Sequence, residues 1–179
     1  MLTLQVPPVS YWDEAKEEFI EHEGLTLNLE HSLYSISKWE SKWLKAYLKN
    51  TPKSAEEAMD YVKCMSIEDI SIDDLDGLGE FELEKINEYI NAPMSATYIN
   101  TPTQTGYSSE TTTSELIYYW MVEFHIPFEC QHWHLNRLLK LISVCNIKKN
   151  PPKKRSQREI AAENKAINDR RRIESNTNG

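Results

Sequence analysis

Glycine is scarce in this sequence, and long apolar runs are absent. The chain has five glycines among 179 residues, and none of them belongs to a glycine-rich loop of the kind that cradles phosphate groups. No stretch approaches the roughly 18 apolar residues that a membrane-spanning helix needs. Three cysteines, odd in number and widely spaced, argue against a disulfide framework and suit a reducing compartment. We expect a soluble cytoplasmic protein.

Negative charge is scarce only in the C-terminal segment, residues 148–179. This segment holds ten Lys and Arg residues and four acids, a balance of +6. Because the whole chain carries −8, residues 1–147 carry −14. A basic segment attached to an acidic body can bind nucleic acid or an acidic protein surface.

The composition of the basic segment separates these partners. No aromatic residue follows Trp133, so the segment lacks the stacking side chains typical of proteins that bind single-stranded nucleic acid. The acidic body would also repel phosphate groups within the Debye length. Both features argue against nucleic acid and favour an acidic protein surface, including the body of a neighbouring copy. A solubilising tail that binds no partner stays open as the alternative.

Two short runs near the N-terminus, Leu2–Val6 and Leu25–Leu29, alternate apolar and polar residues and predict a pair of strands. Between them, residues 11–21 place Trp12 and Phe19 on one helical face. We interpret this stretch as a short helix or an irregular excursion instead of a tight hairpin.

Helical periodicity and capping patterns predict most of the remaining structure. The predicted helices cover residues 33–48, 54–65, 81–90, 112–124 and 128–147. The fourth is apolar over most of its circumference and should be central, and it forms a helical hairpin with the fifth around Pro127. The fold class is mainly α. A helical domain with a small N-terminal two-stranded β element, residues 1–147, precedes a basic linker and a C-terminal helix, residues 148–179, partly disordered alone.

The acidic stretch 73–80 invites a calcium-binding interpretation, which its spacing does not support. Neither Gly77 nor Gly79, taken as the sixth position of a calcium loop, puts carboxylates at the required positions. A solvated loop that enters a helix is the better interpretation.

A second group of residues could carry metal chemistry. Its members are His125, Cys130, His132 and His134, with Cys145 further along the chain. The group lacks the paired short spacings of structural zinc sites. We expect no catalytic residue, no metal and no cofactor, and a metal-dependent enzyme is kept only as a third hypothesis.

Two tryptophans, Trp39 and Trp43, share one face of the helix at residues 33–48. The favoured interpretation is a core stripe, and the alternative is a docking anchor, because tryptophan is enriched at interface hot spots. Cations of the C-terminal segment complete the candidate set. The candidate partner-binding residues are Trp39, Trp43, Lys153, Lys154, Arg155, Arg158, Arg170, Arg171 and Arg172.

A succession of short segments resembles a known family. The segments are 29–33 (LEHSL), 36–43 (ISKWESKW), 86–90 (INEYI), 92–94 (APM), 115–120 (ELIYYW) and 133–138 (WHLNRL), followed by the basic end. In this order the chain resembles the tail assembly chaperones of tailed bacteriophages. The resemblance implies a non-enzymatic helical factor in the host cytoplasm. Such a factor holds the tape measure protein, or tail tube subunits, soluble until the tube polymerises.

A second function stays open beside the chaperone. A small structural component of the virion, in the neck, tail or baseplate, would use the basic C-terminal arm to dock on a neighbouring subunit and order on binding. That subunit could be another copy of this chain, which would make the protein a homo-oligomer.

Overall fold

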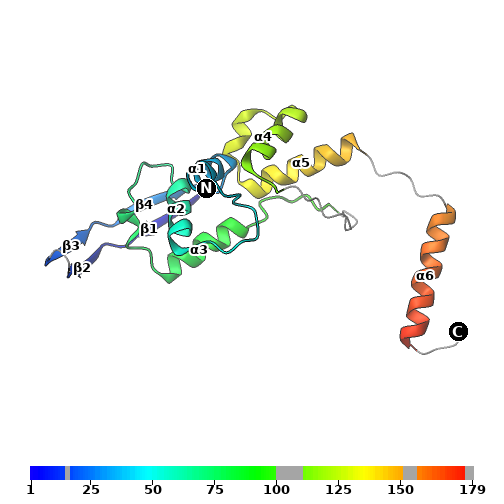
Figure 1. Ribbon diagram of the computed structural model, residues 1–179, viewed down its shortest axis with the longest axis horizontal. Coiled ribbons are helices and arrows are strands. Elements are labelled where there is room, and N and C mark those ends of the chain that lie inside the picture. Colours follow the sequence, from blue (N-terminus) through cyan, green and yellow to red (C-terminus); the bar gives the residue numbers. More distant parts are fainter. Residues whose placement is uncertain (15–16, 100–110, 151–156, 176–179) are drawn as a thin grey trace. The chain divides into compact units, whose positions relative to one another are not determined.

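The computed structural model describes residues 1–14, 17–99, 111–150 and 157–175. The chain divides into two compact units, Met1–Asn146, which we call the body, and Ile147–Gly179, which we call the C-terminal unit. The described residues form six α-helices and two short antiparallel strand pairs (Figure 1). The predicted fold class, mainly α with a small N-terminal β element and a C-terminal helix, is confirmed.

The two predicted strands are present and pair with each other. Strand β1 (Leu2–Val6) is antiparallel to β4 (Leu25–Leu29), with Leu4 opposite Leu27. Their alternation turns one face inward, so that Leu27 and Leu29 are fully buried. This strand pair covers part of the helical core.

The segment between these strands is a hairpin, and the prediction of a short helix or irregular excursion was wrong. Strand β2 (Val9–Asp13) pairs with β3 (Glu18–His22) and places Trp12 opposite Phe19. Their rings lie 5.0 Å apart in an edge-to-face arrangement, which stabilises a strand pair. Pairing of β1 with β4 brings Val6 close to Leu25, so the segment between them can continue as a second strand pair. We call the β1–β4 pair the N-terminal ribbon.

Two capped helices follow the ribbon. Helix α1 (Leu33–Trp43) begins after Ser32, whose hydroxyl accepts the Ser35 N–H. It ends at Leu44, which adopts a left-handed conformation, so it does not continue to residue 48 as predicted. Helix α2 (Ala55–Met65) begins with the predicted capping box of Ser54 and Glu57.

The acidic stretch forms a loop that enters a helix, as predicted. A single 3₁₀ turn, η1 (Asp73–Leu75), precedes helix α3 (Glu80–Asn91). Ile86 and Tyr89 of α3 are buried, whereas Phe81 and Leu83 are exposed. Only positions toward the end of this helix therefore reach the core.

The prediction of a helical hairpin around Pro127 was wrong for its second helix, residues 128–147. Helix α4 (Ser114–Glu123) is followed by a 3₁₀ turn, η2 (Phe128–His132), and only then by α5 (Leu135–Lys149). His134 forms a β-bridge with Ser32, and the Leu135 N–H donates to the His31 carbonyl. These hydrogen bonds hold the chain extended between η2 and α5, so one continuous helix cannot form.

Helix α4 lies at the side of the core and not at its centre. Ile117 and Met121 are fully buried, but Tyr119 and Val122 are 59% and 58% exposed. The largest fully buried side chains come from β4, η1, α1, α2, α4 and α5, so α4 is one contributor among several. They are Leu27, Leu29, Leu33, Ile36, Trp39, Tyr61, Met65, Leu75, Ile117, Met121, Leu135 and Leu138.

The C-terminal unit contains helix α6 (Gln157–Ser175), which begins after Ser156 as the sequence predicts. The three arginines 170–172 lie within this helix. Their side chains are exposed.

Candidate protein-interaction surfaces

Trp39 belongs to the core. Its side chain is 1% exposed, and its indole N–H donates to the Glu57 carbonyl at 2.8 Å. The interpretation of Trp39 as core is therefore confirmed, and Trp39 is not the exposed anchor that the alternative required. It fixes α1 against the first turn of α2.

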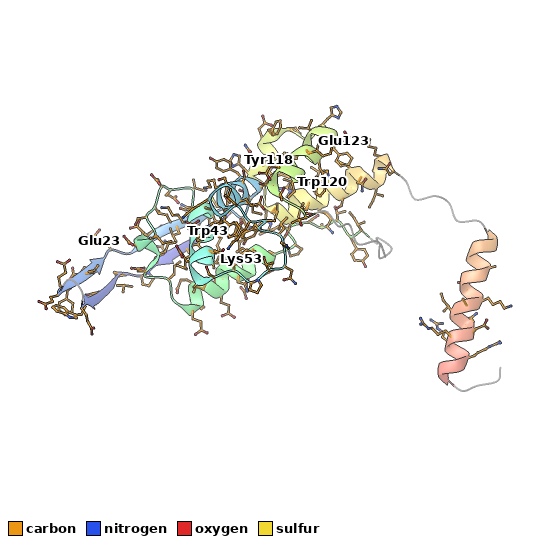
Figure 2. The ribbon with its side chains drawn as sticks, in the orientation of Figure 1. Glu23, Trp43, Lys53, Tyr118, Trp120 and Glu123 are labelled. Carbon is orange, nitrogen blue, oxygen red and sulfur yellow. The ribbon has the colours of Figure 1, made fainter. Side chains whose placement is uncertain are left out.

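Trp43 is half-buried beside Trp39, with ring centroids 6.2 Å apart. Its indole N–H donates to Asp60 at 2.8 Å, and Asp60 also accepts from the Lys42 ammonium. The Lys42 and Lys45 ammonium groups lie 5.5 and 5.8 Å from the Trp43 ring centroid. Trp43, labelled in Figure 2, thus has a structural role, and its role in partner binding stays a prediction.

The histidines and cysteines of the predicted cluster do not converge on one point. Cys130 is buried in η2, whereas His134 follows that turn and its Nε2 donates to the Tyr89 carbonyl, 2.9 Å away. His132 lies 3.5 Å from a Glu30 carboxylate oxygen. Within the part of the chain that the structure describes, no group of three or more His, Cys, Asp or Glu side chains could hold a metal ion.

His134, which is half-buried, instead pairs with the buried His31. The two rings lie 5.0 Å apart, edge to face. Nδ1 of His134 accepts the Asn136 N–H at 3.2 Å, so its other nitrogen carries the proton and donates to the Tyr89 carbonyl. Nδ1 of His31 lies 2.6 Å from the Tyr61 hydroxyl.

Burial sets the protonation state of this pair. Burial, together with the smaller effect of the neighbouring His134, lowers the pKa of His31 from 6.5 to about 3. Burial also lowers the pKa of His134, against the opposing effect of its bond to the Tyr89 carbonyl. Both rings are therefore neutral at pH 7. The sequence analysis did not predict this pair, because His31 lies outside the group of histidines and cysteines considered as metal ligands.

An exposed aromatic surface covers the outer side of α4 and η2. We call it the α4–η2 surface and define it by Tyr34, Tyr118, Tyr119, Val122 and Phe128. Tyr119 and Val122 are more than half exposed, as is Phe128, and Tyr118 packs against Phe128 with ring centroids 6.2 Å apart. Figure 2 shows Tyr118 and Glu123 on this helix. In the sequence, this surface is visible only as the apolar circumference of α4. That pattern led to the prediction that α4 is central, whereas part of it is an exposed surface.

The opposite side of α4 borders a groove of about 430 Å³. Trp120 lines it from α4, Leu139 and Ile142 line it from α5, and Leu48 closes one side. Half of the eight residues that line the groove are apolar, so α4 has exposed or part-exposed apolar groups on two sides.

The β2–β3 hairpin presents a second exposed aromatic group. Trp12 and Phe19 are 48% and 69% exposed. Sequence reasoning placed these two residues on one face but treated that face as helical, because period two and period 3.6 are hard to separate over so few residues.

The predicted basic residues fall into two groups. Arg170, Arg171 and Arg172 are exposed on α6, and Arg158 lies in the first turn of the same helix. Lys153, Lys154 and Arg155 lie outside the described residues. The cations of α6 belong to the C-terminal unit, and Trp39 and Trp43 belong to the body.

No protein-family model, curated protein or solved structure matches the chain. Among the residues that the structure describes, no helix combines the length and apolar character needed to cross a membrane.

Proposed function

We propose that this protein is a non-enzymatic assembly factor, a chaperone that binds the tape measure protein or the tail tube protein of a tailed bacteriophage during virion assembly in the host cytoplasm. The single observation that carries the proposal is the α4–η2 surface. The resemblance to phage tail assembly chaperones supports the choice of client.

The chemistry of this surface suits a chaperone. Tyrosine and phenylalanine offer large contact areas with few rotatable bonds, and exposed apolar patches mark interaction sites on soluble proteins. Val122 is a neighbour of both Tyr118 and Tyr119 on the helix surface, four and three residues after them, so together they present one apolar strip to an amphipathic client helix. The net charge of −14 on residues 1–147 keeps a complex with an apolar client soluble.

Co-expression with the tape measure and tail tube proteins of the same phage, followed by pull-down, tests the proposal. The double variant Tyr119→Ser/Val122→Ser should retain at most about a tenth of the captured client, because each truncation at a hot spot costs more than about 1 kcal/mol. Tyr98→Ser is the matched control, since Tyr98 is 88% exposed and lies in the loop after α3. Equal capture by both variants and the unchanged chain would overturn the proposal.

A second candidate function is that of a small structural component of the virion whose basic arm docks on a neighbouring subunit. The observation that favours it is the separate C-terminal unit with its exposed arginines. Mass spectrometry of purified particles separates the two candidates. A stoichiometric copy number would support the structural component and exclude a chaperone that leaves before maturation.

A further inference from the structure

The β2–β3 hairpin presents aromatic surface to solvent at one end of the body. The rings of Trp12 and Phe19 contact each other, 5.0 Å between centroids, and both stay largely exposed. They oppose each other in the register, so they lie on the same face of the hairpin. Figure 1 shows the hairpin extending beyond the β1–β4 pair. Exposed aromatic groups of this size are typical of interaction surfaces.

Carboxylates are numerous on the hairpin that carries this aromatic pair. Residues 9–23 contain six acids and a single lysine. Five of the acids are described and exposed, and they are Glu14, Glu17, Glu18, Glu21 and Glu23. Glu21 lies two residues from Phe19 and so shares its face. A partner of this face must therefore offer positive charge together with a group that packs on aromatic rings.

The C-terminal unit of this chain offers both properties. Residues 148–179 carry a charge of +6, and Arg170, Arg171 and Arg172 are exposed on α6. A guanidinium group pairs with a carboxylate through two parallel hydrogen bonds and also stacks on aromatic faces. Arginine next to Glu21 and the Trp12–Phe19 pair would satisfy both interactions at once.

Chain length favours a second copy over the same copy as the source of this unit. Seven residues separate α5 from α6, and they span at most about 25 Å. A compact body of this size is about 40 Å across, and Figure 1 shows the hairpin and α5 at opposite ends of it. The part of α6 before Arg170 adds about 20 Å, which brings the reach to about 45 Å. This is close to the straight line through the body and shorter than a path over its surface, whereas a neighbouring copy has no such restriction.

We propose that the β2–β3 hairpin is the docking site for the basic C-terminal unit, residues 147–179, of a second copy of this chain. The contact is head-to-tail, so an open chain of copies keeps one free hairpin at one end and one free C-terminal unit at the other until a ring closes. The inference is independent of the chaperone proposal, and it supplies the acceptor surface that the second candidate function requires.

Sedimentation velocity of the purified full chain at a series of protein concentrations tests the inference. Self-association is expected at about 50 mM NaCl and should be lost near 1 M NaCl, where the Debye length falls to about 3 Å. The hairpin variant Glu18→Lys/Glu21→Lys and the tail variant Arg170→Glu/Arg172→Glu should each weaken association about 100-fold, since they place like charges together.

An equal mixture of the two variants gives the decisive result. Each variant repels itself, but the unchanged tail of one complements the unchanged hairpin of the other, and the two reversed surfaces also complement each other. The mixture should therefore regain association. Glu84→Lys/Glu88→Lys on α3 is the matched control, because it makes the same change of net charge at exposed positions away from the hairpin and should associate like the unchanged chain. Circular dichroism checks that every variant is folded.

Three outcomes would overturn the inference. They are a monomer at every salt concentration, unchanged association of the hairpin variant, and a mixture that does not associate. Zero-length carbodiimide coupling in a mixture of ¹⁴N and ¹⁵N chains adds a fourth. Links from Lys165 to hairpin carboxylates must join different copies, and links within one copy, or to Glu123 or Glu129 of the α4–η2 region, contradict the proposal. Because no phage tail protein is present, failure here leaves the client-capture result unaffected.

Discussion

The carboxylate of Glu40 caps helix α4 from 74 residues away in the sequence: its Oε2 accepts the Ser114 N–H at 2.7 Å. Its other oxygen accepts the Tyr47 N–H, also at 2.7 Å. Glu40 is buried near the end of α1, so one negative charge satisfies two backbone donors and faces the positive end of a helix. This residue ties together α1, the loop after it and α4, and thereby positions the α4–η2 surface.

Glu40→Gln should therefore lower the free energy of unfolding by about 1–3 kcal/mol. The amide keeps one acceptor but turns an N–H₂ group toward a backbone donor, and it removes the charge at the start of α4. Urea denaturation at pH 7 measures the effect. Glu84→Gln, at an exposed position of α3, is the control and should change stability by less than about 0.5 kcal/mol. Equal stability of the two variants would show that the Glu40 contacts contribute nothing.

The neutral pair of His31 and His134 predicts a loss of stability in mild acid. The pKa of His31 is about 3 in the folded chain and 6.5 in the unfolded chain, so below pH 6.5 only the unfolded chain takes up this proton. The stabilisation is complete above pH 6.5 and decreases as the pH falls toward 3. Between pH 7 and pH 5 the contribution of His31 amounts to about 2 kcal/mol.

A variant that cannot take up the proton checks this prediction. His31→Gln should be less stable at pH 7, but its unfolding free energy should fall less steeply between pH 7 and pH 5. His125→Asn is the control, because His125 is exposed with a φ of 54°, a conformation that asparagine tolerates. The control should keep the full pH dependence. The same slope in all three proteins would show that His31 is not the titrating group.

Gly77 and Gly79 should respond differently to a side chain although they are two residues apart. A Cβ at Gly77 would lie 2.7 Å from Val6 Cγ1 and 2.8 Å from the Pro7 carbonyl oxygen. Gly77→Ala should therefore cost about 1–3 kcal/mol, because the loop before α3 and the N-terminal ribbon must separate.

The second glycine provides the comparison. A Cβ at Gly79 meets only the end of the Glu82 side chain, 3.0 Å away. Gly79 precedes α3, so Gly79→Ser should be neutral or slightly stabilising, since serine is a good N-cap residue. Thermal unfolding of both variants gives the order, and a Gly77→Ala protein as stable as Gly79→Ser would contradict the close packing.

Local signals predicted the elements of this fold better than their packing. The capping box of Ser54 and Glu57 and the alternation in β1 and β4 act between near neighbours, and both were predicted correctly. The break between η2 and α5 depends on hydrogen bonds from His31 and Ser32, about a hundred residues away in the sequence. No pattern within residues 128–147 contains that information, so apolar periodicity wrongly predicted one helix.

The same distinction applies to the candidate interaction residues. Helical spacing placed Trp39 and Trp43 on one face correctly, but it does not say which of the two is covered by α2. For α4 the apolar circumference was visible in the sequence, yet only packing against α1 and η2 shows that Tyr119 and Val122 are left exposed. The charge difference between the two units is a compositional property, and it needed no fold at all.

Trp39 and Trp43 supply a last prediction, because both indoles donate a hydrogen bond but differ in burial. Trp39→Phe removes the bond to the Glu57 carbonyl and leaves unfilled volume in the core, so it should lower the unfolding free energy by about 2–3 kcal/mol. Trp43→Phe removes the bond to Asp60, which keeps its bond from Lys42, and should cost about 1 kcal/mol. Urea denaturation measures both, and a larger loss for Trp43→Phe would show that the outer indole carries the α1–α2 contact. With that result, a partner that displaced Lys42 or Lys45 from the Trp43 ring would be expected to weaken the packing of α1 on α2.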